Sequence, residues 1–331
     1  MRTKGWATRV AATLLLAVGV VAAPAGPASA AVNVAYNFWT WNVAGAKINA
    51  GSTTNGMIGV AARSIVNRDA DFAVFNEICQ TQFNALIAEL RELGYPQDST
   101  NFARFTPATP KGACAPGDAK GPFGNAIFSR YPLDGAQRWT LTSDTTGEIH
   151  SLTCVNPTAQ PKMHFCGTHI TAEQTKDADG NLYSGHQLAD VLGQLEAFNN
   201  SGHTAVLAGD LNAQPHYGRL NGFYSSSLNV PNNSGNTGAY RELDDNDSGN
   251  CLGYGEWTAT RPNVNNPTPC GSTLTKIDHI FARQSRIVGS YSGDSLGIST
   301  DCAGNAATSE YPAGSCSDHR IVIGSATVSI G

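Results

Sequence analysis

Long apolar runs, C-x-x-C pairs and a surplus of basic residues are all missing from this sequence, and each absence excludes a class of protein. The apolar stretch at residues 11–23 is shorter than the roughly 20 residues that a transmembrane helix needs, and no later segment approaches that length. Without C-x-x-C pairs, a zinc site built from thiolates is not expected. We therefore expect no stable membrane insertion and no thiolate zinc site.

The charge balance argues against a protein that coats nucleic acid without specificity. The whole chain has 21 basic and 26 acidic residues, and its first thirty residues hold three of the basic ones. The remaining chain therefore has 18 basic and 26 acidic residues, a net charge of −8. A polyanionic substrate would have to be met by a local basic patch or a bound metal, because the overall field repels it.

The first thirty residues have the three parts of a secretory signal peptide. Arg2, Lys4 and Arg9 precede the apolar stretch, and small residues end the segment at Ala30. We predict cleavage after Ala30 and secretion. Residues 31–331 are then expected to form one domain and, by default, a monomer.

All eight cysteines lie after this segment, and an even count in an exported chain favours four disulfides. The sequence cannot choose among the 105 possible connectivities. We predict pairing between neighbours along the chain, with the second pair joining two strands of a hairpin. The predicted pairs are Cys79–Cys114, Cys154–Cys166, Cys251–Cys270 and Cys302–Cys316.

Short apolar runs rich in β-branched and aromatic residues predict strands whose ends carry polar residues. These strands are expected at residues 37–41, 72–75, 163–167, 205–208, 280–282 and 321–323. Apolar residues at helical spacing predict covering helices at residues 55–67, 83–93 and 188–198. Strands that alternate with single helices indicate a layered α/β fold.

The segment from residue 223 to residue 272 is rich in Asn, Gly, Ser and Pro, and we interpret it as a long surface loop near the site. The acidic runs at residues 177–181 and 244–247 have the composition of calcium loops. The first run has Leu188 where an EF-hand loop needs Glu, so we interpret both runs as solvated turns. A structural Ca²⁺ is left open.

Taken singly, the polar residues at the strand ends are weak evidence for a site. Asn42 resembles a turn residue, and Glu77 resembles a partner of a helix dipole. Carboxylate and amide oxygens are nevertheless the ligands that Mg²⁺ takes. The order of these residues along the chain and their local contexts carry the argument.

Seven blocks of sequence resemble one family. The blocks are Thr40-Trp41-Asn42-Val43, Phe75-Asn76-Glu77-Ile78, Gly124-Asn125-Ala126-Ile127-Phe128-Ser129-Arg130-Tyr131-Pro132, Gly167-Thr168-His169, Gly209-Asp210-Leu211-Asn212-Ala213, Lys276-Ile277-Asp278-His279-Ile280-Phe281 and Ser317-Asp318-His319. In this order they are similar to the motifs of the endonuclease/exonuclease/phosphatase superfamily, the deoxyribonuclease-I-like hydrolases. The resemblance implies metal-dependent hydrolysis of phosphate esters. The implied fold is α/β (α+β), a four-layer α/β/β/α sandwich of two mixed β-sheets flanked by helices.

The resemblance also implies a role for each matching residue. Glu77 is the expected main Mg²⁺ ligand, with Asn42 and Asp318 beside it and Mn²⁺ as a possible substitute. The expected catalytic residues are His169, Asp210, Asn212, Asp278 and His319. Asp210 and Asn212 would position water and a phosphoryl oxygen, whereas Asp278 would orient His319. Whether Asp210 or His319 takes the proton of the water stays open.

Two departures from the family pattern concern the substrate side of the site. Some nucleases pair the histidine equivalent to His169 with a glutamate, which we cannot place in this sequence. Position 76 is Asn where many members have Gln, a shortening that keeps an amide near the metal. Neither departure threatens catalysis, but the first blurs the choice of substrate.

The shared motifs do not separate nucleases from other phosphoesterases. We expect Asn125 and Arg130 to bind substrate, and Arg104, Arg241 and Arg261 are further candidates for phosphate contacts. No aromatic-rich hairpin for membrane docking is evident, so a nuclease acting on DNA or RNA is the favoured hypothesis. A sphingomyelinase-like, inositol-phosphate or other small-molecule phosphoesterase is the alternative, and a non-catalytic binding module is a remote one.

Overall fold

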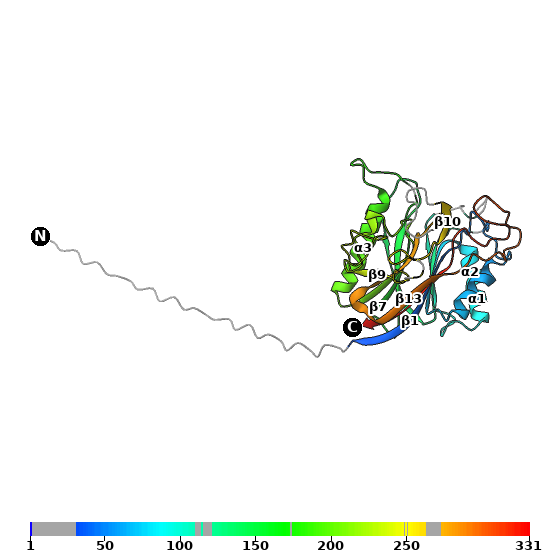
Figure 1. Cartoon of the computed structure of the whole chain (residues 1–331). Coiled ribbons are helices and arrows are strands. Elements are labelled where there is room, and N and C mark those ends of the chain that lie inside the picture. The colour runs from blue at the N-terminus through cyan, green and yellow to red at the C-terminus, as the bar shows by residue number, and fades with distance from the viewer. Residues whose placement is uncertain are drawn as a thin grey trace. The chain divides into compact units, whose positions relative to one another are not determined.

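Two β-sheets packed face to face, with helices on both outer sides, form the domain seen in the computed structural model (Figure 1). The structure describes Met1 and residues 31–109, 114, 121–172, 174–247, 249, 251–262 and 273–331. Residues 2–30 of the predicted signal peptide, residues 1–30, thus lie outside the described residues. No described helix is long and apolar enough to cross a membrane.

The first sheet has six strands in the order β13-β14-β1-β2-β4-β3. Their bounds are β1 Val32–Asn42, β2 Phe72–Cys79, β3 Ala103–Pro107, β4 Phe123–Ser129, β13 Ile287–Ser295 and β14 Val322–Ile330. Strands β1 and β2 are parallel, and the other neighbours are antiparallel. Helix α1, Met57–Asn67, connects the parallel pair, as a crossover between parallel strands requires.

The second sheet repeats this plan in the order β5-β6-β7-β8-β12-β9. Its strands are β5 Leu133–Thr140, β6 Ser151–Pro157, β7 Met163–His169, β8 Thr204–Asp210, β9 Tyr240–Glu242 and β12 Asp278–Arg283. Strands β7 and β8 form the one parallel pair, connected by helix α3, Tyr183–Asn200. Both sheets are therefore mixed, as predicted.

Three apolar layers fill the spaces between the four structural layers. Helices α1 and α2, Gln80–Glu92, cover the first sheet, and α3 covers the second (Figure 1). Between the sheets, the rings of Phe38, Phe72 and Phe165 lie with centroids 4.9 to 6.3 Å apart. The predicted strands and helices are confirmed, and with them the four-layer sandwich. Short elements complete the chain: β10 Ala259–Pro262, β11 Leu274–Thr275, and the 3-10 helices η2 Gly218–Leu220 and η3 Gln284–Arg286.

Three of the four predicted disulfides are confirmed. They are Cys79–Cys114, Cys154–Cys166 and Cys302–Cys316. The second joins directly opposed residues of the β6–β7 hairpin. Cys251 is disulfide-bonded, but its predicted partner Cys270 lies outside the described residues.

The interpretation of the segment after residue 222 as surface loop was wrong for much of its length. Phe223, Tyr224 and Tyr240 are buried against the second sheet, and Tyr240 begins its edge strand β9. Asp244 and Asp245 are buried as well, so the run that contains them is not a solvated turn. Ion pairs make this burial possible: Asp245 is paired with the nearby Arg241, and Asp244 is paired with Lys276, 32 residues away. A sequence without periodicity does not reveal the second pair. Residues 263–272 lie outside the described residues.

Candidate functional site

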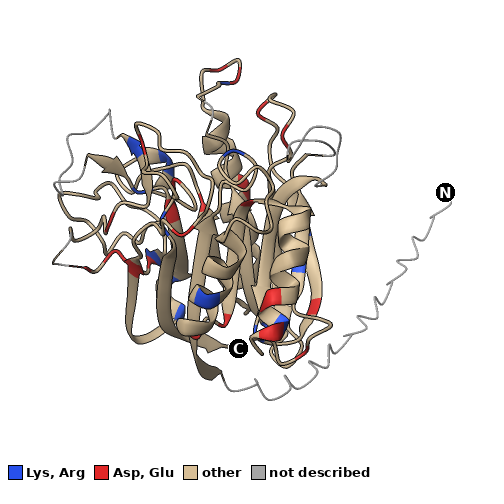
Figure 2. Cartoon of the chain, turned by 90° about the vertical axis from the view of Figure 1, so that its right-hand side faces the viewer, with Lys and Arg blue, Asp and Glu red and all other residues tan. Residues whose placement is uncertain are grey.

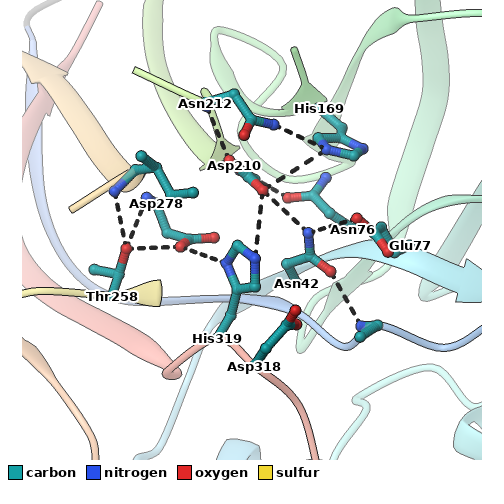
Figure 3. Close-up of polar contacts among 12 residues, drawn as sticks. Asn42, Asn76, Glu77, His169, Asp210, Asn212, Thr258, Asp278, Asp318 and His319 are labelled. Atoms are coloured by element: carbon teal, nitrogen blue, oxygen red, sulfur yellow. Dashed lines mark hydrogen bonds and ion pairs between the residues drawn. The ribbon is translucent and has the colours of Figure 1, made fainter. Parts of the chain in front are cut away.

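Strand register brings the predicted site residues to one edge of the sandwich. Asn42 is paired with Asn76 across β1 and β2, and Asp210 is paired with both His169 and Asp278 in the second sheet. Asn42, His169 and Asp210 end their strands, Asp278 begins its strand, and Asn76 lies near the end of β2, so the five side chains meet at the rim (Figure 3). Asp210 and His169 line a cavity of about 290 Å³ at this edge.

Asp210 lies at the centre of the cluster. Its Oδ2 accepts a hydrogen bond from Asn42 Nδ2 at 3.0 Å and lies 3.7 Å from His169 Nε2 and 3.9 Å from His319 Nε2. Its backbone N–H donates to Asn76 Oδ1 at 2.8 Å, which ties the two sheets together at the site. Burial and the nearby charge of Asp278 raise the pKa of Asp210 to about 6, although both histidines oppose the shift.

Glycine at position 209 is required by this arrangement. Its φ of +141° is a conformation that L side chains rarely adopt, and a Cβ there would lie 2.1 Å from the carbonyl oxygen of Thr168. Gly209 and Asp210 therefore have different tasks. The glycine lets β8 lie close to β7, and this closeness brings the Asp210 carboxylate near His169.

His319 and Asp278 form the expected pair. His319 Nδ1 lies 2.8 Å from Asp278 Oδ2, and the same oxygen accepts from Thr258 Oγ1 at 2.7 Å. Burial disfavours the charged ring, but Asp278, Asp210 and Asp318 outweigh it and raise the pKa of His319 to about 10. The ring is therefore protonated at neutral pH, with its Nε2 toward Asp210.

The backbone around Ser317-Asp318-His319 is fixed by its serine. Ser317 Oγ donates to the carbonyl of Asn42 at 2.7 Å and accepts from the N–H of His319 at 3.0 Å. The carbonyl of His319 in turn accepts from Trp41 Nε1 at 3.0 Å. These bonds attach the Ser317-Asp318-His319 segment to the end of β1, and so fix the positions of Asp318 and His319 relative to the first sheet.

Glu77 reaches the cavity through a strained backbone. Its φ is +57°, and the register between β2 and β4 shifts at this point, as at a β-bulge. Ala44 and Asn212 also have positive φ, 45° and 46°, so three strained non-glycine residues lie at one rim. Such strain persists where the surroundings enforce it, and it is concentrated at functional sites.

The donor set at Glu77 and Asp318 fits a hard divalent cation. Both carboxylates line the cavity, and the ammonium of Lys47 lies 3.1 Å from Asp318 Oδ2. Although partial burial opposes it, the charges of Asp318 and Glu77 raise the pKa of Lys47, which indicates that the position favours a cation. One or two carboxylates with water are the usual protein ligands of Mg²⁺.

Asn42 stands behind this pair of carboxylates. Its Nδ2 donates to Glu77 Oε1 at 3.0 Å and its Oδ1 accepts from the N–H of Ala44 at 3.1 Å. Direct coordination by Asn42 requires its amide to rotate. A second set of possible ligand atoms, on Asp210, Asp278 and His319, lies within 4.8 Å of one another, and Asp278 and His319 are also joined by a hydrogen bond.

His169 has the acidic neighbour that the sequence left unplaced. Glu148 Oε1 lies 3.9 Å from His169 Nδ1, and Asn212 Nδ2 lies 3.3 Å from Nε2. The register of the β6–β7 hairpin could have predicted this position of Glu148. Because Cys154 is opposite Cys166, the residues just before β6 lie near His169 at the end of β7.

Thr258 and Lys47 were also missed. Thr258 lies in the aperiodic segment after residue 222, and Lys47 lies in the turn region after β1. Neither position carries a sequence signal, because each gains its role from a carboxylate far along the chain. Thr258 bonds Asp278, and Lys47 pairs with Asp318.

Two predicted substrate-binding residues lie elsewhere. Arg130 follows β4 and pairs with Asp69 at 2.6 Å, at the end of the sheet opposite the site, because β4 runs antiparallel to β2. Asn125 does not line the cavity; its Oδ1 accepts from Asn76 Nδ2 at 2.9 Å and supports that amide from behind. Neither Asn125 nor Arg130 is among the residues that line the cavity.

The other candidate arginines divide in the same way. Arg104 bonds Asn101 within the first sheet, and Arg241 is paired with the buried Asp245. Arg261, exposed on β10, lines the same cavity as Asp210 and His319. Basic and acidic residues are otherwise interspersed over the helices and loops (Figure 2).

Comparisons with known proteins agree with this geometry. A sequence model of the Endonuclease/Exonuclease/phosphatase family matches residues 39–319. No curated protein matches the chain in sequence. Among solved structures, the human nocturnin catalytic domain with bound sulfate is similar, with a TM-score of 0.60 and 17% identity over 90% of this chain and 97% of that one. An endonuclease/exonuclease/phosphatase from Beutenbergia cavernae has a TM-score of 0.54 and 18% identity over 89% and 72%. Truncated Caenorhabditis elegans TDP2 has a TM-score of 0.53 and 10% identity over 88% and 98%. At these identities the structures support the fold alone.

Proposed function

This chain belongs to the Endonuclease/Exonuclease/phosphatase family, and on that premise we propose that it is a secreted, Mg²⁺-dependent phosphodiester hydrolase that acts on nucleic acid. The observation that carries the proposal is the placement of Asp210 Oδ2 between two histidine rings, 3.7 and 3.9 Å away, at the wall of the cavity. A carboxylate so placed can hold a water molecule while the rings face the phosphate.

Each residue then has a distinct task. Asp210 orients the attacking water and accepts its proton, because His319 is already protonated through its bond to Asp278. His319 Nε2 and the amide of Asn212 donate to phosphoryl oxygens, where negative charge grows in the transition state.

The metal completes the electrostatics. Held by Glu77 and Asp318, with Asn42 beside them, Mg²⁺ would neutralise charge on the phosphoryl oxygens. Lys47 is then released from Asp318 or stays as an additional cation. Glu148 orients His169 from the far side of the ring.

Secretion is supported by the disulfides that the structure contains, because such bonds persist in oxidising compartments. Processing after Ala30 would be checked by mass spectrometry of the protein recovered from the medium. A mature chain that begins at residue 31 is the expected result, and retention in the cell with an intact N-terminus would contradict it.

The activity is tested by offering plasmid DNA, sphingomyelin and inositol phosphates to the purified protein, each with Mg²⁺ and with EDTA. We expect nicked DNA with Mg²⁺, Mn²⁺ as a partial substitute, and no product with EDTA. Lipid or inositol-phosphate turnover without nicking would overturn the nucleic-acid part of the proposal. Turnover of any of these that persists in EDTA would overturn the metal requirement.

A further inference from the structure

A second cavity, of about 600 Å³, adjoins the catalytic cavity. The two share Ala172, Asn212, Arg261 and Ile277 in their walls. Asn212 follows the catalytic Asp210 by two residues and lies within hydrogen-bond distance of His169. A substrate with one phosphate at Asn212 is therefore already at the entrance of the second cavity.

The two cavities differ in charge. Six carboxylate side chains line the catalytic cavity, whereas none of the described residues that line the second cavity is acidic. The charged side chains of the second cavity are Arg219 and Arg261. In a domain with an overall negative charge, this is the local basic surface that a polyanion needs.

Arg219 is held in place without a carboxylate. Its Nη2 donates to the carbonyl of Asn212 at 2.8 Å, and its guanidinium lies 4.5 Å from the ring centroid of Tyr217. Its Nε is buried without a hydrogen-bond partner, and no ion pair joins Arg219 to any described residue. A half-buried cation in this state gains from an anion.

Tyr217 is fixed as well. Its hydroxyl accepts from Gln214 Nε2 at 2.8 Å, and the buried Gln214 in turn accepts from the hydroxyl of Tyr254. Tyr217 lies in the same loop as Asn212 and lines only the second of the two cavities. An aromatic ring can stack on a nucleotide base, and arginines without a carboxylate partner can bind its phosphate, so this arrangement suits a nucleotide.

We propose that the second cavity is a flanking subsite, formed by Gln214, Tyr217, Arg219 and Arg261, that binds the nucleotide next to the scissile phosphate. The flanking phosphate lies at the two arginines, and the base packs against Tyr217. This inference rests on the proposed function and sharpens its substrate class: the enzyme acts on chains with at least two phosphates, in preference to small diesters with one.

The test compares two substrates that differ in reach. Bis(p-nitrophenyl) phosphate has one phosphate and no base, whereas a fluorescent 12-nucleotide single strand is long enough to reach both cavities. Tyr217→Ala is the main variant, Tyr217→Phe keeps the ring, and Arg63→Ala on the exposed face of α1 is the matched arginine control. Arg219 is left intact, because it also holds the backbone of Asn212.

For Tyr217→Ala we expect a KM for the oligonucleotide about tenfold higher, with kcat and the small substrate unchanged. Tyr217→Phe should restore the KM to within about twofold. Arg261→Ala should raise the same KM about tenfold and lower the slope of log KM against log salt by about one, as expected for one lost phosphate contact. Arg63→Ala should do neither.

Other outcomes separate the two proposals. If Tyr217→Ala and Arg261→Ala leave the oligonucleotide KM unchanged, or slow both substrates equally, the flanking subsite is wrong while the nuclease activity stands. If the wild type cleaves the small diester but not the oligonucleotide, the nucleic-acid proposal fails, and the subsite fails with it.

Discussion

Two clusters of buried charged side chains lie only two residues apart along the approach to β12, yet only one of them faces a cavity. Lys276 is fully buried, and its Nζ lies 2.9 Å from Glu242 and 2.6 Å from Asp244. Asp278 forms a second cluster with Asp210 and His319, at the cavity of the candidate site. We call these the sealed cluster and the open cluster.

The difference lies in where each charge finds its partner. In the sealed cluster the lysine meets both carboxylates inside the protein, and Gly255 closes the space: a Cβ there would lie 2.4 Å from Lys276 Nζ. In the open cluster Asp210 and Asp278 share one protonated ring, that of His319, and Asp210 also lines the cavity. A buried charge that lacks its own partner is poised to act on a substrate, whereas a satisfied one contributes to the fold.

Asp210→Asn should produce the largest effect. Without the carboxylate no group orients and deprotonates the water, so we expect kcat for DNA nicking to fall about a thousandfold or more. The amide still accepts from Asn42 and removes a charge that burial disfavours, so the melting temperature without metal should be unchanged or higher.

The control for this experiment is Asp179→Asn on an exposed turn, which should keep full activity. If Asp210→Asn retained more than a tenth of the wild-type kcat, or if it melted several degrees lower, Asp210 would belong with the satisfied charges and the distinction between the clusters would fail.

Lys276→Met should damage the fold instead. The substitution leaves Glu242 and Asp244 buried without their cation, and breaking a buried pair on one side costs about 3–5 kcal/mol in the free energy of unfolding. Urea denaturation measures this loss. Nicking activity per folded molecule should stay within a few-fold of the wild type, because Lys276 lines neither cavity.

A triple variant keeps this prediction testable if the single variant does not fold. Lys276→Met combined with Glu242→Gln and Asp244→Asn removes all three charges, so it should recover at least half of the lost stability. A single variant that loses less than about 1 kcal/mol would show that the sealed cluster contributes little.

The sequence predicted the open cluster much better than the sealed one. Apolar runs that end in Asn42, Glu77 and Asp210 predict strand ends, and strand ends share an edge. Nothing local links Lys276 to Asp244, 32 residues away, so the acidic run was misread as solvated. Long-range partners decide whether a charge is buried, and a single sequence does not contain them.

Strand direction explains where Arg130 lies. Its sequence block matches the family motif, but the antiparallel pairing of β4 with β2 places Arg130 at the end of the sheet away from the cavity. Glu148 could have been found from the sequence. The predicted Cys154–Cys166 pair sets the register of the hairpin, and this register places Glu148 near His169.

Thr258→Val removes the hydroxyl group that holds Asp278 of the open cluster in place. Thr258 Oγ1 donates to Asp278 and accepts from the backbone N–H groups of Ile277 and Asp278, each at 3.0 Å. Without this hydroxyl the Asp278 carboxylate is held less firmly, and it orients the ring of His319 less well. We expect a loss of about tenfold in kcat with little change in KM, and about 1–2 kcal/mol in stability.

Thr258→Ser is the matched control, because it keeps the hydroxyl and should restore kcat to within about twofold. If Ser and Val behaved alike, the methyl group and its packing would matter rather than the hydrogen bond to Asp278, and Thr258 would not be a positioning residue.

His164 supplies a third environment, a buried titratable side chain that belongs to neither cluster. Its ring stacks on Phe198 at 3.9 Å, and its Nε2 lies 2.8 Å from His203 Nδ1. Burial, with a smaller effect of His203, lowers the pKa of His164 from 6.5 to about 4. The folded protein therefore binds a proton more weakly here than the unfolded chain does.

The sign of the pH effect follows from this difference. Between about pH 6.5 and pH 4 the unfolded state takes up the proton first, so His164 causes stability to fall as the pH falls through this window. His164→Phe keeps a ring against Phe198 and cannot titrate. Urea denaturation at pH 7 and pH 4.5 should show that the wild type loses about 2 kcal/mol more than the variant. Equal losses in the two proteins would mean that the folded protein protonates His164 as readily as the unfolded chain does, and that burial does not keep this ring neutral.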